Sequence, residues 1–198
     1  MLIEHRGRRP AIATSAYIAS TAVISGDVSI GEGARILHGA VLSAEDGAIE
    51  IGANTIVMEH AVVRGRAGRN VLVGAAVMVG PHTHINGATV ADGAFIATGA
   101  ALFPGSVVGA GAEVRINAVV QVNSVVAAAE VVPIGWVAVG NPAQLFSPDR
   151  HEEIWAIQRT LDFVGTVYGV DGSTSMTELM SGQSDFYGAH HDDRELPH

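Results

Sequence analysis

The sequence predicts an all-β solenoid, a parallel β-helix of six-residue repeats followed by one C-terminal α-helix. Three observations predict this fold. An aliphatic residue recurs every six positions, glycines and other small residues fill many places between, and a single segment of helical periodicity follows the repeats. A six-residue period fits neither the 3.6-residue turn of a helix nor an ordinary hairpin. It is typical of short strands that turn a corner every six residues and stack on the coil below.

The repeat defines the predicted core. Every one of its twenty sites is Ile, Leu or Val. Three such strands close one coil, so the repeat predicts about seven three-sided coils around a column of mainly β-branched side chains. The sites are Ile12, Ile18, Ile24, Ile30, Ile36, Leu42, Ile51, Val57, Val63, Val73, Val79, Ile85, Val90, Ile96, Leu102, Val108, Val114, Val120, Val126 and Val132.

The register breaks three times, all within residues 42–90. The step from Leu42 to Ile51 is nine residues and carries the acidic segment 43–47. The step from Val63 to Val73 is ten residues and carries the basic segment 64–70, and a five-residue step follows Ile85. Loops inserted into a rigid solenoid are where sites are usually built. We expect the functional surface here, and we expect the two oppositely charged loops to meet a neighbouring subunit.

The β-helix domain is predicted to span residues 1–146. Ser147 has the character of an N-cap, with Pro148 at the first helical position. Apolar residues at helical spacing within 147–169 predict one helix that packs on the solenoid or on a neighbouring subunit. Residues 170–198 are polar and rich in Gly and Ser, which predicts a mobile tail.

Composition excludes several classes of protein. The absence of cysteine excludes disulfides and thiolate metal sites. A net charge of −9 argues against nucleic acid or an anionic membrane as the main partner. The N-terminus lacks an apolar signal core, and the chain has no apolar run of membrane-spanning length. These features favour a cytoplasmic protein that acts on a small molecule.

Histidines gather near the irregular coils. His82 and His84 are two residues apart, so on an extended segment their rings point to the same side. His60 precedes them by one coil. Neutral imidazole is a common ligand for Zn²⁺ and Fe²⁺, and three such ligands with one open position would activate water. His60, His82 and His84 are therefore the candidate metal ligands. The alternative is that they are turn or interface histidines that hydrogen-bond backbone carbonyls.

Several motifs resemble those of the γ-class carbonic anhydrase family. They are Ile51-Gly52-Ala53-Asn54, Val73-Gly74, Val79-Gly80, the five-residue slip at Ile85-Asn86-Gly87, and the terminal Gly140-Asn141-Pro142-Ala143. The resemblance covers residues 12–163. It implies a left-handed β-helix, a homotrimer, and a Zn or Fe site at subunit interfaces, held by three histidines.

The family's ligand positions are changed in this chain. Its three ligand histidines fall on Arg64, Pro81 and Asn86, and its motif aspartate falls on Glu59. An arginine is a permanent cation and a proline side chain has no donor atom, so the family's own metal site is absent. Glu59, Arg64 and Asn86 remain the candidate catalytic residues. Arg64, Asn86 and the histidines could instead bind a carboxylate or phosphate between subunits.

Three functions stay open on the sequence. The first is metal-dependent hydration or hydrolysis at a relocated histidine site. The second is a hexapeptide acyltransferase that moves an acyl group from acyl-CoA to a small acceptor, with His60 or His38 as general base. The third is a non-catalytic trimeric scaffold that binds an anion or another small ligand.

Overall fold

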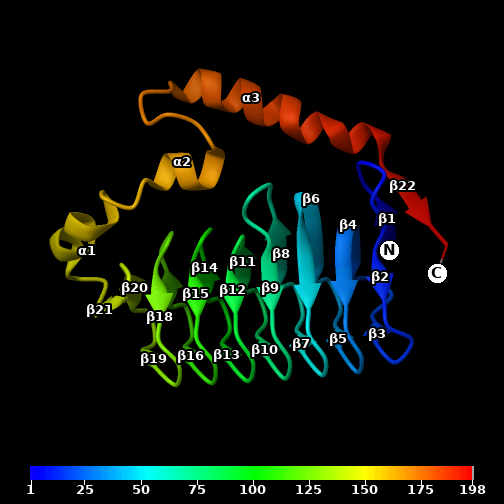
Figure 1. Cartoon of the computed structure of the whole chain (residues 1–198), viewed down its shortest axis with the longest axis horizontal. Coiled ribbons are helices and arrows are strands. Elements are labelled where there is room, and N and C mark those ends of the chain that lie inside the picture. Colours follow the sequence, from blue (N-terminus) through cyan, green and yellow to red (C-terminus); the bar gives the residue numbers. More distant parts are fainter. Residues whose placement is uncertain (198) are drawn as a thin grey trace.

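The chain winds into a β-helix whose coils stack side by side along the long axis of the molecule (Figure 1). The computed structural model describes residues 1–197. One face is a seven-stranded parallel sheet in the order β19-β16-β13-β10-β7-β5-β3. The other two faces form one continuous fifteen-stranded sheet. They are joined because β4 and β6 run through a corner, pairing with each other from Val23↔Val41 to Ile30↔Ile51 across one irregularity in register.

Most strands are two or three residues long, as expected where a corner follows every six residues. Their bounds are β1 Leu2–Glu4, β2 Ala11–Ile12, β3 Tyr17–Ile18, β4 Val23–Ile30, β5 Arg35–Ile36, β6 Val41–Ile51, β7 Ile56–Val57, β8 Val62–Gly65, β9 Val71–Val73, β10 Met78–Val79, β11 His84–Asn86, β12 Thr89–Val90, β13 Phe95–Ile96, β14 Ala101–Leu102, β15 Val107–Val108, β16 Glu113–Val114, β17 Val119–Val120, β18 Val125–Val126, β19 Val131–Val132, β20 Val137–Val139, β21 Gln144–Phe146 and β22 Arg194–Leu196.

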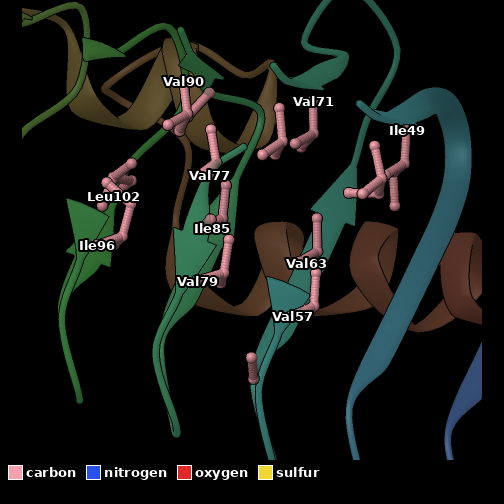
Figure 2. Close-up of a cluster of buried hydrophobic side chains, with 14 of the residues drawn as sticks. Ile49, Val57, Val63, Val71, Val77, Val79, Ile85, Val90, Ile96 and Leu102 are labelled. Atoms are coloured by element: carbon pink, nitrogen blue, oxygen red, sulfur yellow. The ribbon is translucent and has the colours of Figure 1, made fainter. Parts of the chain in front are cut away.

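The predicted core column is confirmed. Of the twenty repeat sites, the eighteen from Ile24 to Val132 are buried, and Ile12 and Ile18 in the first coil are partly buried. Their side chains point into the solenoid from stacked strands (Figure 2). Because each strand also bonds to the strands above and below, aliphatic burial and the backbone ladder support the same register.

The two charged loops contact each other within one chain, and their expected contact with a neighbouring subunit stays a prediction. Asp46 accepts a hydrogen bond from the Ala67 amide at 2.8 Å and lies 3.6 Å from Arg66. Ser43 and Ala44 pair in register with Arg64 and Gly65. The reason is the solenoid geometry, which stacks consecutive insertions directly on one another.

The region after the solenoid contains two helices where one was predicted. Helix α1 spans His151–Gln158 and helix α2 spans Phe163–Tyr168. The first begins after Arg150, which makes no side-chain cap, so Ser147 is not its N-cap. The chain breaks at Asp162, whose φ of 47° is left-handed and whose carboxylate accepts from the Gly165 amide to cap α2. None of the helices described within residues 1–197 is long and apolar enough to cross a membrane.

The segment predicted as a mobile tail contains a helix and a strand. Helix α3 spans Met176–Gly188 and begins with a capping box in which Ser175 and Glu178 satisfy each other's backbone amides. It runs back along the solenoid toward the first coils, and the one-turn 3₁₀ helix η1 (Ala189–Asp192) follows (Figure 1). Strand β22 then pairs antiparallel with β1. The last residue of the predicted tail, at position 198, lies outside the described residues.

Candidate functional site

A pocket of about 560 Å³ lies between the solenoid and the helices α2 and α3. The solenoid side is formed by β8, β11 and the residue after β14, which are stacked neighbours in three successive coils. Its lining residues from the solenoid are Arg64, Arg66, His84, Asn86 and Phe103. Those from the helices are Phe163, Val167 and Tyr168 of α2 and Met180, Gln183, Ser184 and Tyr187 of α3. The pocket thus combines two cations, one histidine, amides and several aromatic rings.

His84 is the titratable base of this pocket. It is half-buried on β11, and Ile85, the next residue, points the other way into the core. Burial lowers the pKa of the His84 imidazole from its ordinary 6.5, and the positive charge of Arg64 lowers it further. Both effects favour the neutral ring. A neutral imidazole at physiological pH is ready to accept a proton from a bound molecule.

Asn86 and Arg64 have unused hydrogen-bonding capacity beside His84. Their backbones are paired across neighbouring coils. Within residues 1–197, the Asn86 Oδ1 and Arg64 Nε atoms are buried without a hydrogen-bond partner. Arg64 is held by the Tyr187 hydroxyl at 3.3 Å and by the ring of the same residue, 5.7 Å from its guanidinium carbon. Arg64 Nε is directed at the Glu45 carboxylate, 3.8 Å from Oε1. Asn86 Oδ1 has no such neighbour among the described residues, and because buried polar atoms without a partner are costly, it is suited to bind a polar ligand.

Aromatic side chains form the apolar wall of the pocket. The Phe103 and Phe163 ring centroids are 5.7 Å apart, and Tyr168 meets Phe163 edge-on at 6.5 Å. Phe163 and Tyr168 lie within the segment 147–169 that was predicted to be helical, but no site role was predicted for them. The α3 side of the pocket was missed because residues 170–198 were expected to be a mobile tail. The signal that could have found it is the Ser175-x-x-Glu178 capping box.

The three candidate metal ligands do not converge within one chain. His60 and His82 are exposed turn residues with left-handed φ values of 58° and 56°, and their rings stack with centroids 5.3 Å apart. His84 lies beyond the turn, in the pocket. Among the described residues, the group of His, Asp and Glu side chains that could hold a metal is instead His5, Glu45 and His190. A centre made from His60, His82 and His84 stays a prediction for an assembly of chains.

The other predicted residues divide between two places. Arg64 and Asn86 line the pocket with His84, as expected for a shared site. Glu59 precedes His60 at the turn, where its carbonyl accepts from the His82 amide at 3.1 Å, and it does not line the pocket. His38, a candidate general base, is exposed at the turn one coil earlier and lies 2.8 Å from the Thr21 hydroxyl.

Comparison with solved structures gives the fold a family context. A hexapeptide transferase family protein from Anaplasma phagocytophilum superposes with a TM-score of 0.54 and 26% identity, over 82% of this chain and 92% of its own. The chain is a hexapeptide-repeat β-helix protein. A Bacillus cereus protein assigned as an acetyltransferase gives a TM-score of 0.57 and 21% identity over 93% and 95% of the two chains. These similarities confirm the left-handed β-helix.

Further hexapeptide-repeat structures match at lower identity. A UDP-N-acetylglucosamine acyltransferase from Bacteroides fragilis gives a TM-score of 0.57 and 15% identity over 98% of this chain and 90% of its own. At that identity the likeness shows the fold alone. No family model matches the sequence, and no curated protein matches it. The hexapeptide-repeat superfamily of the predicted resemblance is confirmed by the structural matches above. These matches do not show that the chain is a γ-class carbonic anhydrase.

Proposed function

We propose that this chain is an acyltransferase that moves an acyl group from a thioester such as acyl-CoA to the hydroxyl or amine of a small anionic acceptor. The observation that carries this proposal is a half-buried His84 with a lowered pKa, set in a pocket beside unpartnered polar atoms of Arg64 and Asn86. The 26% identical Anaplasma phagocytophilum structure, a hexapeptide transferase family protein, favours the same reaction class. In this proposal the general base is His84, which lines the pocket, and not His60 or His38 as the sequence analysis suggested.

In the proposed reaction, the neutral His84 imidazole accepts the proton of the acceptor hydroxyl or amine. The acceptor oxygen or nitrogen then forms a bond to the thioester carbonyl carbon. When the tetrahedral intermediate collapses, the carbon–sulfur bond breaks and the proton on His84 passes to the departing thiolate. The products are the acylated acceptor and a free thiol, so the base is restored after each cycle.

The other pocket residues bind and orient the acceptor. Arg64 and Arg66 are partly compensated by Glu45 at 3.8 Å and Asp46 at 3.6 Å, and both of these contacts are made by Nε. Their remaining N–H groups suit a carboxylate or phosphate on the acceptor. The amide of Asn86 is placed to hydrogen-bond a polar group next to the reacting atom. The aromatic wall of Phe103, Phe163 and Tyr168 excludes water and covers the apolar part of the bound molecules.

The test is release of free thiol from acetyl-CoA in the presence of small carboxylated or phosphorylated amines and alcohols. His84→Asn should lower kcat by about 100-fold or more, the usual contribution of a general base. His82→Asn is the matched control, because this exposed histidine lies two residues away and outside the pocket. Equal activity of the two variants would overturn the assignment of the base.

The same preparations test the two competing functions. Stoichiometric metal together with carbon dioxide hydration would favour the metal-dependent lyase. Binding of an anionic ligand without turnover of any thioester would favour a non-catalytic binder. Either result, obtained without thiol release, would end the acyltransferase proposal.

We also propose a homotrimer. The face that carries β13 exposes three large apolar residues, Phe95 at 42%, Ile116 at 45% and Ile134 at 63%, which together line a groove of about 550 Å³. The adjacent face carries a larger hollow of about 760 Å³ along Ile12, Ile30, Ile51 and Leu72, without a histidine or a cation. Exposed apolar patches of this kind mark contact surfaces. Light scattering should give three times the chain mass, and Ile134→Glu should lower it. A wild-type monomer at micromolar concentration would contradict this.

A further inference from the structure

A second cluster of titratable groups lies just beyond the C-terminal end of α3, and its members do not line the pocket. It brings together three segments far apart in the sequence: the turn after β1, strand β6, and η1 at the end of α3 (Figure 1). His5 and Glu45 are almost fully buried, at 1% and 4% exposed, and His190 is partly buried. One ligand atom from each of these residues lies within 4.8 Å of the other two.

Asp193 sets the orientation of both imidazole rings. Its two carboxylate oxygens accept hydrogen bonds from His5 Nδ1 at 2.5 Å and from His190 Nδ1 at 2.8 Å. The two rings stack with centroids 4.4 Å apart and planes 26° apart, and the Nδ1 edge of each ring faces Asp193. An ionised carboxylate only accepts, so both Nδ1 atoms carry hydrogens. Both Nε2 atoms are then left with lone pairs in the neutral rings.

The two lone pairs have different neighbours: His5 Nε2 lies 3.3 Å from the Arg6 Nε donor, whereas His190 Nε2 faces an acceptor. The His190 Nε2 atom lies 3.0 Å from Glu45 Oε2, which is also an acceptor. The Glu45 carboxylate is further fixed by the Ser43 hydroxyl at 2.8 Å and by Arg64 at 3.8 Å, both on Oε1. Oε2 is therefore the oxygen directed at the imidazoles. Two acceptors at this separation are compatible only with a cation or a shared proton between them.

We propose that His5 Nε2, His190 Nε2 and the Glu45 carboxylate bind a divalent transition metal ion, with Zn²⁺ as the best fit, and that the ion fastens the C-terminal segment to the solenoid. Two imidazole nitrogens and one carboxylate oxygen are a ligand set that Zn²⁺ accepts in a tetrahedral site with one further position. A carboxylate that holds the Nδ1 hydrogens of two histidines is the usual second partner of metal-bound imidazoles. The site is separate from the predicted His60, His82 and His84 set.

The charges around the site are compatible with a bound dication. Glu45 and Asp193 supply two negative charges to a largely buried space. Arg64 contacts the far oxygen of Glu45, and Arg6 donates to His5 Nε2 at 3.3 Å. The Arg6 side chain belongs to an exposed residue and also rests on the Phe186 ring at 5.1 Å. Arg6 also donates to the Phe186 carbonyl at 3.2 Å, so binding of the ion at His5 Nε2 requires Arg6 to leave its contacts with His5 and Phe186.

The ion would act on the pocket through α3. His190 follows α3 directly, and α3 supplies Met180, Gln183, Ser184 and Tyr187 to the pocket wall. A metal bond between η1 and the solenoid therefore limits how far α3 can lift from the pocket. The metal site does not depend on the reaction proposed for the pocket, since its ligands do not line it.

The experiment is titration of the chelator-treated full-length protein with Co²⁺ and Zn²⁺. Tetrahedral Co²⁺ should give visible absorption at one equivalent, and Zn²⁺ should remove it. His190→Ala and Glu45→Gln should each weaken binding by more than about 100-fold, because a three-ligand site loses one ligand. Glu45→Gln keeps the shape of the side chain, so it tests binding where His190→Ala disturbs folding. His191→Ala is the matched control, an exposed histidine in the same turn.

A second measurement separates a metal site from a proton-linked contact. Hydrogen exchange of the α3 amides should slow when Zn²⁺ is added to wild type and stay unchanged in Glu45→Gln. Absence of the cobalt absorption in wild type, or equal binding by wild type and Glu45→Gln, would overturn the proposal. Neither readout uses thiol release, so the acyltransferase proposal succeeds or fails separately.

Discussion

Ile85 connects the core to the candidate site, and its truncation gives a prediction that can be worked from the structure. Its side chain is fully buried, and its neighbours on the same strand are the pocket residues His84 and Asn86. Its partners in the adjacent coils, Val63 and Leu102, are fully buried as well. The strand is hydrogen-bonded on both sides, so the surrounding coils cannot collapse onto a space left inside.

Ile85→Ala removes three buried carbons. At about 0.8 kcal/mol per methylene, the lost transfer free energy is about 2.4 kcal/mol. A residual cavity on the order of 50 Å³ adds about 1.2 kcal/mol at roughly 24 cal/mol per Å³. We expect the free energy of unfolding to fall by about 3–4 kcal/mol. Ile85→Val removes one carbon and should cost about 1 kcal/mol.

Urea denaturation followed by circular dichroism measures both changes. The matched control is Ile134→Ala, because Ile134 is 63% exposed and its truncation should cost less than about 1 kcal/mol in the separated chain. Because Ile134 lies on the face proposed to contact other subunits, the denaturation is repeated at decreasing protein concentration until the free energy of unfolding no longer depends on concentration. If Ile85→Ala cost no more than Ile134→Ala under dilute conditions, the reasoning that the solenoid interior is rigid and closely packed would be refuted.

Three further predictions concern His84 in the pocket, the close packing of Gly26 against the Ala44 backbone, and the C-terminal segment. Because burial and Arg64 both lower the pKa of His84, the rising limb of the kcat/KM–pH profile should lie below pH 6.5, and Arg64→Met should move it upward; an unmoved limb would exclude the charge effect. Because the pKa of His84 is lower in the folded chain, the unfolded chain binds the proton first as the pH falls. The free energy of unfolding therefore decreases from about pH 6.5 down to the lower pKa of the folded state. Gly26→Ala places a methyl group 2.3 Å from the Ala44 carbonyl oxygen at a φ of 80° and should cost at least about 2 kcal/mol, whereas Gly111→Ala, at a φ of 65° with open space around it, should cost about 1 kcal/mol by thermal denaturation. Removal of residues 170–198 should leave the β-helix spectrum intact, because its core column holds no residue of this segment, yet abolish thiol release through loss of the α3 wall.

The solenoid was predictable because its signal is local and repeated. Twenty aliphatic sites specify the same turn geometry, and each contributes independently to the pattern. Arg64 and Asn86 lie side by side and line one pocket, since neighbouring coils stack in register, and their role in a site stays a prediction. The contact between the two charged loops within one chain follows from the same stacking of neighbouring coils.

The C-terminal half of the pocket was not predictable from the repeat. Helix α3 has only one buried residue, Leu179, so its amphipathic pattern is weak. Its position is fixed by long-range contacts, such as the hydrogen bond between His5 and Asp193, which joins residues 188 apart. The sequence does not reveal such contacts, because neither partner belongs to a periodic pattern. The two-residue spacing from His82 predicted that His84 is a metal ligand. Burial and the nearby Arg64 charge, which the sequence does not reveal, instead favour the neutral imidazole that a general base needs.

The antiparallel strands β22 and β21 have a consequence for how copies of this molecule can meet. On the face that carries the pocket, β22 covers the outer edge of β1 and β21 covers the outer edge of β20, whereas the other two faces end at β2 and β18 and at β3 and β19 with no antiparallel strand among the described residues. A solenoid with bare terminal coils would offer its first and last strands as templates for another copy, and end-to-end fibres would follow. The direction of the chain reverses at both ends of this one face, and each of the two capping strands is only three residues long. Longitudinal growth is therefore discouraged, and the exposed apolar faces leave lateral association as the route to a closed assembly.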